Sequence, residues 1–302
     1  MKTFLDKLFK KPSQAQSTGE MNVQTTPLTE EQLKVVTQEP IPMHPQQYLA
    51  GCGQSNGLQR DHNEDALFMM STVVADGKSD LPFGIFIIAD GMGGHIHGEA
   101  ASQAAARVVA KYLISKVYYK LIDPNPEPMD ESLQETVESA IREAQKAVLR
   151  YAPGGGTTLT CALTLGDQVT IGHIGDSRAY FVYPDGRTQR ITQDHSLVQR
   201  MVDLNEITEE EAMSHPNRNV LLRALGQADP VRADIQTHQA PRVGYLLLCS
   251  DGLWGSVPDA QIHKIISNAP DPSLACHKLV EAANAAGGPD NISVILVNFL
   301  GQ

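Results

Sequence analysis

Cysteine is scarce in this sequence, and its four copies are far apart along 302 residues. No two of them have the short C-x-x-C spacing of a zinc site, so the sequence does not indicate structural zinc. Cys161 and Cys249 lie inside apolar runs, where a thiol behaves as a small hydrophobic side chain. This usage of cysteine favours a reducing, cytoplasmic setting.

Long apolar runs and an excess of basic residues are also absent. No apolar run approaches the roughly 20 residues that cross a bilayer, and Met1–Lys11 alternates apolar and charged residues where a secretory signal would be apolar. We therefore expect no membrane span. The chain has 24 Lys and Arg against 35 Asp and Glu, a net charge of −11. This balance argues against a nucleic-acid-binding surface, because the phosphate backbone attracts clusters of Lys and Arg.

The rest of the composition is that of a globular protein, with 41% hydrophobic and 20% charged residues. Residues 1–46 differ, because Gln, Pro, Thr and Ser dominate there and hydrophobic periodicity is poor. We expect a flexible N-terminal tail over 1–46, followed by one folded domain over 47–302. A short basic amphipathic helix within 2–11 that docks on a membrane surface or a partner is the alternative for the start of the tail.

Runs of β-branched, aromatic and other apolar residues predict eight strands. They cover residues 48–54, 65–72, 83–89, 157–165, 169–174, 179–183, 244–249 and 292–299. Asp185-Gly186 predicts a hairpin turn, since Gly tolerates positive φ.

Apolar residues at helical spacing predict three helices, around 101–113, 133–148 and 275–286. Each has an apolar stripe that we expect to face the core. Strands joined by hairpins, with helices arriving in pairs, predict antiparallel sheets covered by helices, which is an α+β layered fold.

Five aspartates fall at the ends of predicted strands. Asp90, Asp176 and Asp251 follow strands, Asp65 opens one, and Asp290 closely precedes one. Any single Asp could cap a helix or form a turn, but a sheet holds strand ends rigidly, so carboxylates there can converge. Clustered carboxylates repel unless a cation lies between them. Oxygen ligands without clustered Cys or His favour Mg²⁺ or Mn²⁺ over zinc.

Two further features lie beside these acids. The glycines that follow Asp90 let the backbone come close to an ion, so that the Gly91 carbonyl can serve as a ligand. Arg60 lies four residues before Glu64 and five before Asp65. A guanidinium beside a metal cluster suits two phosphate oxygens, although a salt bridge to a neighbouring acid is an equally simple role.

Six short motifs, in this order, resemble those of the type 2C family of metal-dependent serine/threonine protein phosphatases, in its bacterial form. They are 57–60 (GLQR) with 64–66 (EDA), 89–94 (ADGMGG), 156–158 (GTT), 175–179 (GDSRA), 250–253 (SDGL) and 288–291 (GPDN). The resemblance covers about residues 48–300. It implies a central sandwich of two antiparallel β-sheets flanked by helix pairs, with a phosphatase catalytic domain over 47–302.

The resemblance also implies a metal site with two Mg²⁺ or Mn²⁺ ions. Asp90 is expected to bridge both ions and the Gly91 carbonyl to bind one of them, while Asp251 and Asp290 bind the other. Asp176 matches the position that helps to hold a third, weaker ion in bacterial members.

Other residues receive roles from the same resemblance. Arg60 is expected to grip the substrate phosphate. Glu64 and Asp65 are expected to act beside the metals through bound waters, with Asp65 also a metal ligand. Asn291 is expected to support the loop that carries Asp290.

The implied activity is hydrolysis of phosphoserine and phosphothreonine in proteins by water that the binuclear centre activates. The alternative is a catalytically silent regulator of the same fold that binds phosphoproteins. A serine hydrolase is disfavoured, because no G-x-S-x-G motif accompanies 175–177. A regulator that dephosphorylates an anti-anti-sigma factor would share the chemistry and differ only in substrate.

The general acid stays open. Met92 stands where some family members have a His, so a metal-bound water is the favoured proton source, with His95 and His97 as alternatives. His173, inside a predicted strand, is interpreted as a core histidine. Residues 195–226 resemble the mobile flap of bacterial members, and the acidic run 204–213 either influences substrate choice or is a solvated helix face.

Expected partners follow from the same family. They are phosphorylated proteins, with a serine/threonine kinase and its substrates as the candidate pathway. The protein is expected to be a cytoplasmic monomer.

Overall fold

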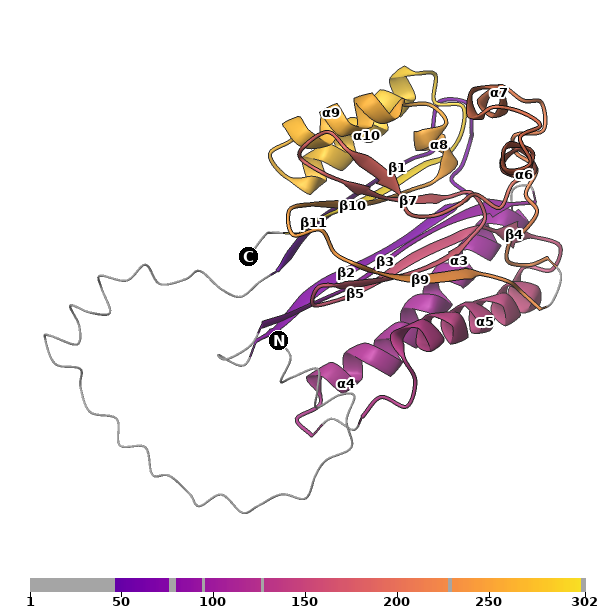
Figure 1. Ribbon diagram of the computed structural model, residues 1–302. Coiled ribbons are helices and arrows are strands. Elements are labelled where there is room, and N and C mark those ends of the chain that lie inside the picture. The colour runs from indigo at the N-terminus through magenta and orange to yellow at the C-terminus, as the bar shows by residue number, and fades with distance from the viewer. Residues whose placement is uncertain (1–46, 76–79, 94–95, 126–127, 228–229, 300–302) are drawn as a thin grey trace, which may run out of the picture.

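The computed structural model describes residues 47–75, 80–93, 96–125, 128–227 and 230–299. The tail expected over 1–46, including its candidate basic helix, lies outside these ranges, as does His95. Two β-sheets lie face to face, and helices cover the outer face of each sheet (Figure 1). The predicted α+β sandwich of two antiparallel sheets is confirmed.

One sheet is built from the first, last and middle strands of the described chain. Its order is β1 (Tyr48–Ser55), β11 (Ile292–Phe299), β10 (Gly244–Cys249), β7 (Arg178–Val182) and β8 (Thr188–Arg190). All four neighbouring pairs are antiparallel. The Asp185-Gly186 turn joins β7 to β8 as predicted, with Gly186 at φ +97°.

The other sheet carries the longest strands. Its order is β2 (Asp65–Ala75), β3 (Asp80–Met92), β5 (Leu159–Leu165), β6 (Gln168–Ile174) and β9 (Asp234–Gln239), and the short β4 (Gly156–Thr157) pairs with the end of β3. The strand predicted over 157–165 is thus interrupted at Thr158, whose N–H donates to the Asp90 carbonyl at 2.8 Å.

Helices form the outer layers. On the β3 sheet lie α3 (Ile96–Leu113), a π-helical turn (Ile114–Tyr118), α4 (Tyr119–Ile122) and α5 (Leu133–Tyr151). On the β11 sheet lie α8 (Asp251–Trp254), α9 (Asp259–Asn268) and α10 (Pro272–Ala285). None of the described helices is both long enough and apolar enough to cross a bilayer.

Helix α5 begins where its sequence provides a capping box. Ser132 accepts from the Glu135 N–H, and the Glu135 carboxylate accepts from the Ser132 N–H at 2.8 Å. The predicted apolar stripe of this helix, which includes Val137, Ile141 and Val148, is fully buried against α3 and the sheet.

The core between the sheets is made by alternate strand residues. Phe86 and Ile88 of β3 pack there with Phe181 of β7, Leu248 of β10 and Ile295 of β11. Because strand side chains alternate between the two faces, Ile85 and Ile87 point the other way, into the helix layer. This burial on both faces explains the continuous apolar run of β3.

Some expectations were wrong or incomplete. Ala286 was placed on the buried face of the last helix, but it follows α10 and is exposed, because the chain turns away at Gly287 and Gly288 with positive φ. The elements that were not predicted include strand β9 and helix α9. The sequence of β9 is mostly polar because it forms an edge of its sheet, and α9 buries only Ile262 and Ile266.

Candidate metal centre

Asp65 and Asp90 are neighbours at one end of the β2–β3 pair. They lie opposite each other in the antiparallel register. Hydrogen bonds to Thr158 fix the backbone of Asp90 on both sides: its N–H donates to the Thr158 hydroxyl at 2.9 Å, and its carbonyl accepts the Thr158 N–H. The sheet therefore fixes the backbone positions from which both carboxylate side chains extend.

Gly91 continues β3 in a crowded position. Its N–H donates to the Glu64 carbonyl at 3.2 Å, and a Cβ at this position would lie 2.3 Å from the Gly98 carbonyl oxygen. Only glycine lets α3 approach the strand end this closely. The role of the Gly91 carbonyl as a metal ligand stays a prediction.

Asp251 comes from the opposite sheet, as the first residue of α8 immediately after β10. Ser250 connects it to the first pair, because the Ser250 hydroxyl donates to Asp65 Oδ2 at 2.8 Å. The Ser250 N–H donates to the Ser293 carbonyl at 3.0 Å, which links the end of β10 to the start of β11. The two sheets are thus joined at the end where the aspartates gather.

Asp290 precedes β11 and forms an ion pair with Arg60, with 2.9 Å between Asp290 Oδ2 and Arg60 Nη2. About half of the Arg60 side chain is exposed. Both roles considered for Arg60 are therefore compatible, since the salt bridge orients a guanidinium that still has free surface.

Asn291 is a hub of hydrogen bonds. Its amide group donates to the carbonyls of Asn56 and His62, each at 2.9 Å, and its side-chain oxygen accepts the Glu64 N–H at 2.7 Å. Its own N–H donates to the Asp290 carboxylate at 2.9 Å. Asn291 thus hydrogen-bonds the segment that leads to Glu64 as well as the neighbouring Asp290, while its role as a support for the Asp290 loop stays a prediction.

Asp176 lies buried in the turn between β6 and β7, after Gly175 at φ +109°. Burial and the nearby Asp251 carboxylate raise its pKa. The structure thus brings Asp176 to the same region as the other four aspartates.

Burial and mutual repulsion dominate the electrostatics. Burial raises the pKa of Asp65 to about 7 and that of Asp251 to about 6, with Asp290 contributing to both. Burial also raises the pKa of Asp90, and Asp65, Asp251, Asp176 and Asp290 all raise it further. Carboxylates that repel one another this way lie close together.

The donor set suits a hard divalent cation. Asp65 Oδ1 and Asp251 Oδ1 are buried and have no hydrogen-bond partner among the described residues. Buried carboxylate oxygens without a partner are costly unless a cation compensates them. In the described ranges, no group of three or more His, Cys, Asp or Glu side chains is already arranged to hold a metal ion. The assignment of a metal site therefore depends on the type of donor and on the strand ends from which the donors extend.

The histidines divide into structural and peripheral ones. His173 is buried, with its ring nitrogens 2.9 Å from the Thr160 hydroxyl and 3.1 Å from the Gln193 carbonyl oxygen, which agrees with a core role. Burial lowers its pKa to about 4. His97 is exposed in the first turn of α3.

Sequence reasoning missed several residues of this region. Ser250 anchors Asp65, Thr158 fixes Asp90, and His62 Nε2 lies 3.1 Å from Glu64 Oε1. His62 stands two residues before Glu64, so the acidic neighbour was visible in the sequence. The roles of Ser250 and Thr158 depend on contacts between distant strands, which no local pattern indicates.

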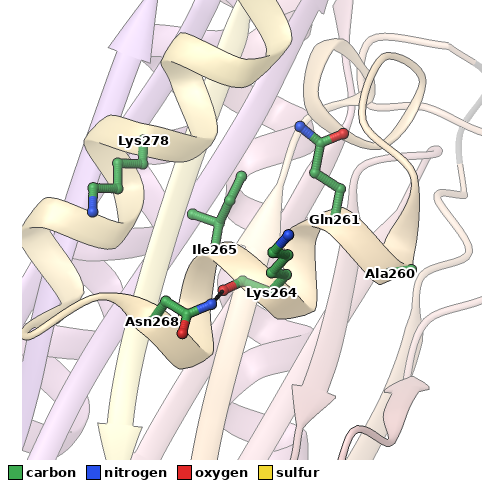
Figure 2. A pocket seen from close by; sticks show the side chains of 6 residues that line it. All are labelled: Ala260, Gln261, Lys264, Ile265, Asn268 and Lys278. Carbon is green, nitrogen blue, oxygen red and sulfur yellow. Dashed lines mark hydrogen bonds between the residues drawn. The ribbon is translucent and has the colours of Figure 1, made fainter.

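A separate hollow lies between α9 and α10 (Figure 2). Its lining combines Ile265 with two lysines, Lys264 and Lys278, and includes none of the predicted site residues. This hollow is therefore separate from the acidic region, which is the group of Asp65, Asp90, Asp176, Asp251 and Asp290.

The sequence profile described as Protein phosphatase 2C matches residues 52–278. The chain belongs to this family. Among similar 2C proteins, the serine/threonine phosphatase stp of Listeria innocua is 37% identical over 250 residues, which are 80% of this chain and 92% of that protein. The serine/threonine protein phosphatase PstP of Mycobacterium tuberculosis is 35% identical over 247 residues, 81% of this chain and 43% of PstP.

Solved structures of 2C phosphatases give the same result. The catalytic domain of PstP in complex with two manganese ions has a TM-score of 0.68 and 31% identity, covering 85% of this chain and all of that one. Stp1 from Staphylococcus aureus has a TM-score of 0.66 and 30% identity, covering 87% of this chain and all of that one. The family resemblance read from the motifs is confirmed.

Proposed function

We propose that this chain is a metal-dependent protein phosphatase that hydrolyses phosphoserine and phosphothreonine. The observation that carries the proposal is that four aspartates from both sheets lie close enough to Asp90 to raise its pKa. Two buried carboxylate oxygens of this group, Asp65 Oδ1 and Asp251 Oδ1, have no hydrogen-bond partner among the described residues. Membership of the 2C family, and the two manganese ions in the PstP relative, support the same conclusion.

The residues proposed to hold two Mg²⁺ or Mn²⁺ ions are Asp65, Asp90, Gly91 through its carbonyl, Asp251 and Asp290, with Asp176 helping to hold a third. When bound, such ions lower the pKa of a coordinated water and shield the negative charge of a phosphate. The protein contributes fixed positions: Asp90 is held by Thr158, and Asp65 by Ser250.

Arg60 is proposed to bind the phosphate of the substrate. A guanidinium can donate two parallel hydrogen bonds to phosphate oxygens, and the Asp290 ion pair limits the directions in which it points. Glu64, beside His62, is proposed to orient water near the ions, and Asn291 to keep Glu64 and Asp290 in place.

The rival function, a silent phosphoprotein-binding regulator, predicts that a carboxylate of the centre is missing. Asp90, Asp251 and Asp290 are all present and lie in one region. Nothing in the relatives favours a silent protein, since those named above are phosphatases.

The test is Mn²⁺-dependent hydrolysis of a phosphothreonine peptide by wild type, Asp251→Ala and Asp130→Asn. Asp251→Ala removes a proposed ligand and should abolish turnover with the fold retained by circular dichroism. Asp130 is exposed on a loop, so Asp130→Asn is the matched control for loss of one acidic charge and should keep wild-type activity. A folded Asp251→Ala protein with full activity would contradict the proposal, as would wild-type activity that persists in chelator.

Three finer points belong to the same proposal. Phosphoproteins are the substrates, with a serine/threonine kinase acting on the same proteins. The protein works as a monomer in the cytoplasm, where its four free cysteines would stay reduced. Size-exclusion chromatography with light scattering tests whether the protein is a monomer, and fractionation of the source cells tests whether it is cytoplasmic.

A further inference from the structure

A half-buried arginine and the sole tryptophan of the chain join two of the acidic segments. Arg178 opens β7, two residues after Asp176, and Trp254 ends α8, the helix that begins with Asp251. The guanidinium carbon of Arg178 lies 3.5 Å from the centroid of the Trp254 ring. The Trp254 indole N–H donates to the Asp176 carbonyl at 3.0 Å. One side chain of α8 thus contacts the backbone of Asp176 and the arginine that follows it.

Hydrogen bonds fix the orientation of the Arg178 guanidinium. Its Nε and Nη2 donate to the two oxygens of Asp194 at 3.0 and 2.7 Å, and Nη1 donates to the Tyr180 hydroxyl at 3.1 Å. The Asp194 side chain is only 4% exposed. A bidentate pair with a third hydrogen bond and a stacked ring leaves the guanidinium one orientation.

The turn of Asp176 is gripped from its other side as well. The His195 N–H donates to the Gly175 carbonyl at 2.7 Å, and the Gly175 N–H donates to His195 Nδ1 at 3.2 Å. Trp254 therefore provides the contact that fixes this turn relative to α8, while His195 fixes it relative to the segment that follows β8.

We propose that Trp254 and Arg178 are positioning residues that hold Asp176 at a set distance from Asp251, so that both carboxylates can serve one ion centre. This inference rests on the proposed function for the identity of the centre. Residues behind the ligands typically change metal affinity about 10- to 100-fold when they are replaced. Loss of the Trp254 and Arg178 contacts should therefore lower the affinity for the most weakly bound ion, whose site depends on Asp176.

The test is calorimetric titration of the full chain with MnCl₂, for wild type, Trp254→Phe, Arg178→Lys and Tyr180→Phe. Trp254→Phe keeps a ring on Arg178 and loses the hydrogen bond to Asp176. Arg178→Lys keeps the charge and loses the planar fork. Both should weaken the weakest Mn²⁺-binding step about tenfold or more. Tyr180→Phe removes one hydrogen bond from the same guanidinium but keeps its bidentate pair with Asp194, the Trp254 ring and the Trp254–Asp176 hydrogen bond, so Mn²⁺ affinity should stay within about twofold of wild type.

Activity provides the second readout. The turnover number of Trp254→Phe should fall at low Mn²⁺ and recover when Mn²⁺ is raised about tenfold, with an unchanged KM for a small aryl phosphate. A loss that Mn²⁺ does not restore and that follows the melting temperature would show a merely structural role. Wild-type affinity in both variants, or an equal effect of Tyr180→Phe, would also overturn the proposal.

Wild-type protein allows a measurement without any substitution, since all tryptophan fluorescence comes from Trp254. Its emission should change as the most weakly bound Mn²⁺ ion binds, and unchanged emission at saturation would refute the positioning role of Trp254. These ion-binding measurements stay informative if wild type hydrolyses no phosphopeptide, which would refute only the proposed function.

Discussion

At the scale of single residues, the acidic region depends on side chains that hold the carboxylates as much as on the carboxylates themselves. Asn291 illustrates this, because its buried side chain connects the segment of Asn56 and His62 to Glu64. A charged side chain could not replace it, since the arrangement needs two donors and one acceptor together.

Replacement of Asn291 by Ala should therefore lower both stability and turnover. It leaves two backbone carbonyls and one N–H without their partner, and each buried unpaired group costs about 1–3 kcal/mol. Urea unfolding should show a loss in the upper part of that range. Asn268→Ala, an exposed helix-end residue with one hydrogen bond, should change stability by less than about 0.5 kcal/mol, and equal effects of both variants would contradict the assigned role.

Arg60 offers a sharper test of substrate binding. Arg60→Ala should lower kcat/KM for a phosphothreonine peptide about 10- to 100-fold, because charge-assisted hydrogen bonds contribute about 1.5–3 kcal/mol each. Mn²⁺ affinity should change little. The control is Arg187→Ala, which removes an exposed arginine paired with Asp185 and should leave kcat/KM at the wild-type value. A variant that loses Mn²⁺ binding and keeps its kcat/KM at saturating Mn²⁺ would show that Arg60 serves the metal centre instead.

At the scale of elements, residues 195–226 leave the β7 sheet and return beside the acidic region. A bridge between Ser196 and Leu221 closes the loop, and a bridge between Leu225 and Thr157 joins its end to β4. It carries α6 (Leu197–Asp203) and α7 (Glu209–Met213). Helix α7 has its own capping box, from Thr208 and Glu211, and all its residues keep exposed surface. Such an element adds little to the core, so it is free to contact substrates.

Deletion of residues 204–213, with Asp203 joined to Ser214 by a short Gly-Ser linker, should therefore spare stability and alter specificity. We expect the ratio of activities between two phosphopeptides of different sequence to change several-fold, while hydrolysis of a small aryl phosphate stays near wild type. Steady-state kinetics on the three substrates measures this. Equal losses on all of them would remove the idea that α7 affects substrate choice.

The elements also show how far sequence reasoning reached. Strands that are buried on both faces, such as β3, and helices with a full apolar stripe, such as α5, were predicted because burial writes a clear pattern. Edge strand β9 and the short α9 were not, since only part of each is buried. The aspartates were predicted as a group, but their anchors Ser250 and Thr158 were not, because those contacts cross between distant segments.

At the scale of the whole molecule, the acidic centre makes the metal-free protein sensitive to pH. The folded state raises the pKa of Asp65 to about 7, against about 4 for Asp in an unfolded chain. Between these values the folded chain binds more protons, so stability falls as pH rises. Histidines with lowered pKa, such as His173, act in the opposite sense below about pH 6.5.

The clearest window is therefore from about pH 7 to 8, where these histidines are mostly neutral in both states. In chelator, the melting temperature of wild type should fall across this window, and Mn²⁺ should raise it more at pH 8 than at pH 7. Differential scanning calorimetry measures both effects. Asp65→Asn, which cannot titrate, should show a flatter decline, and a wild-type melting temperature that rises with pH would contradict the assigned burial.

The strand order has a consequence for how the protein becomes active during synthesis. Among the described strands, β11 is made after all the others and inserts between β1 and β10, and Asp290 and Asn291 emerge immediately before it. Until that segment leaves the exit tunnel, the nascent chain has a split sheet, lacks the Asp290 carboxylate near Asp90, and lacks the Asn291 side chain that holds Glu64. A truncated translation product should thus be inert, which would protect phosphorylated proteins in the cell from half-finished enzyme.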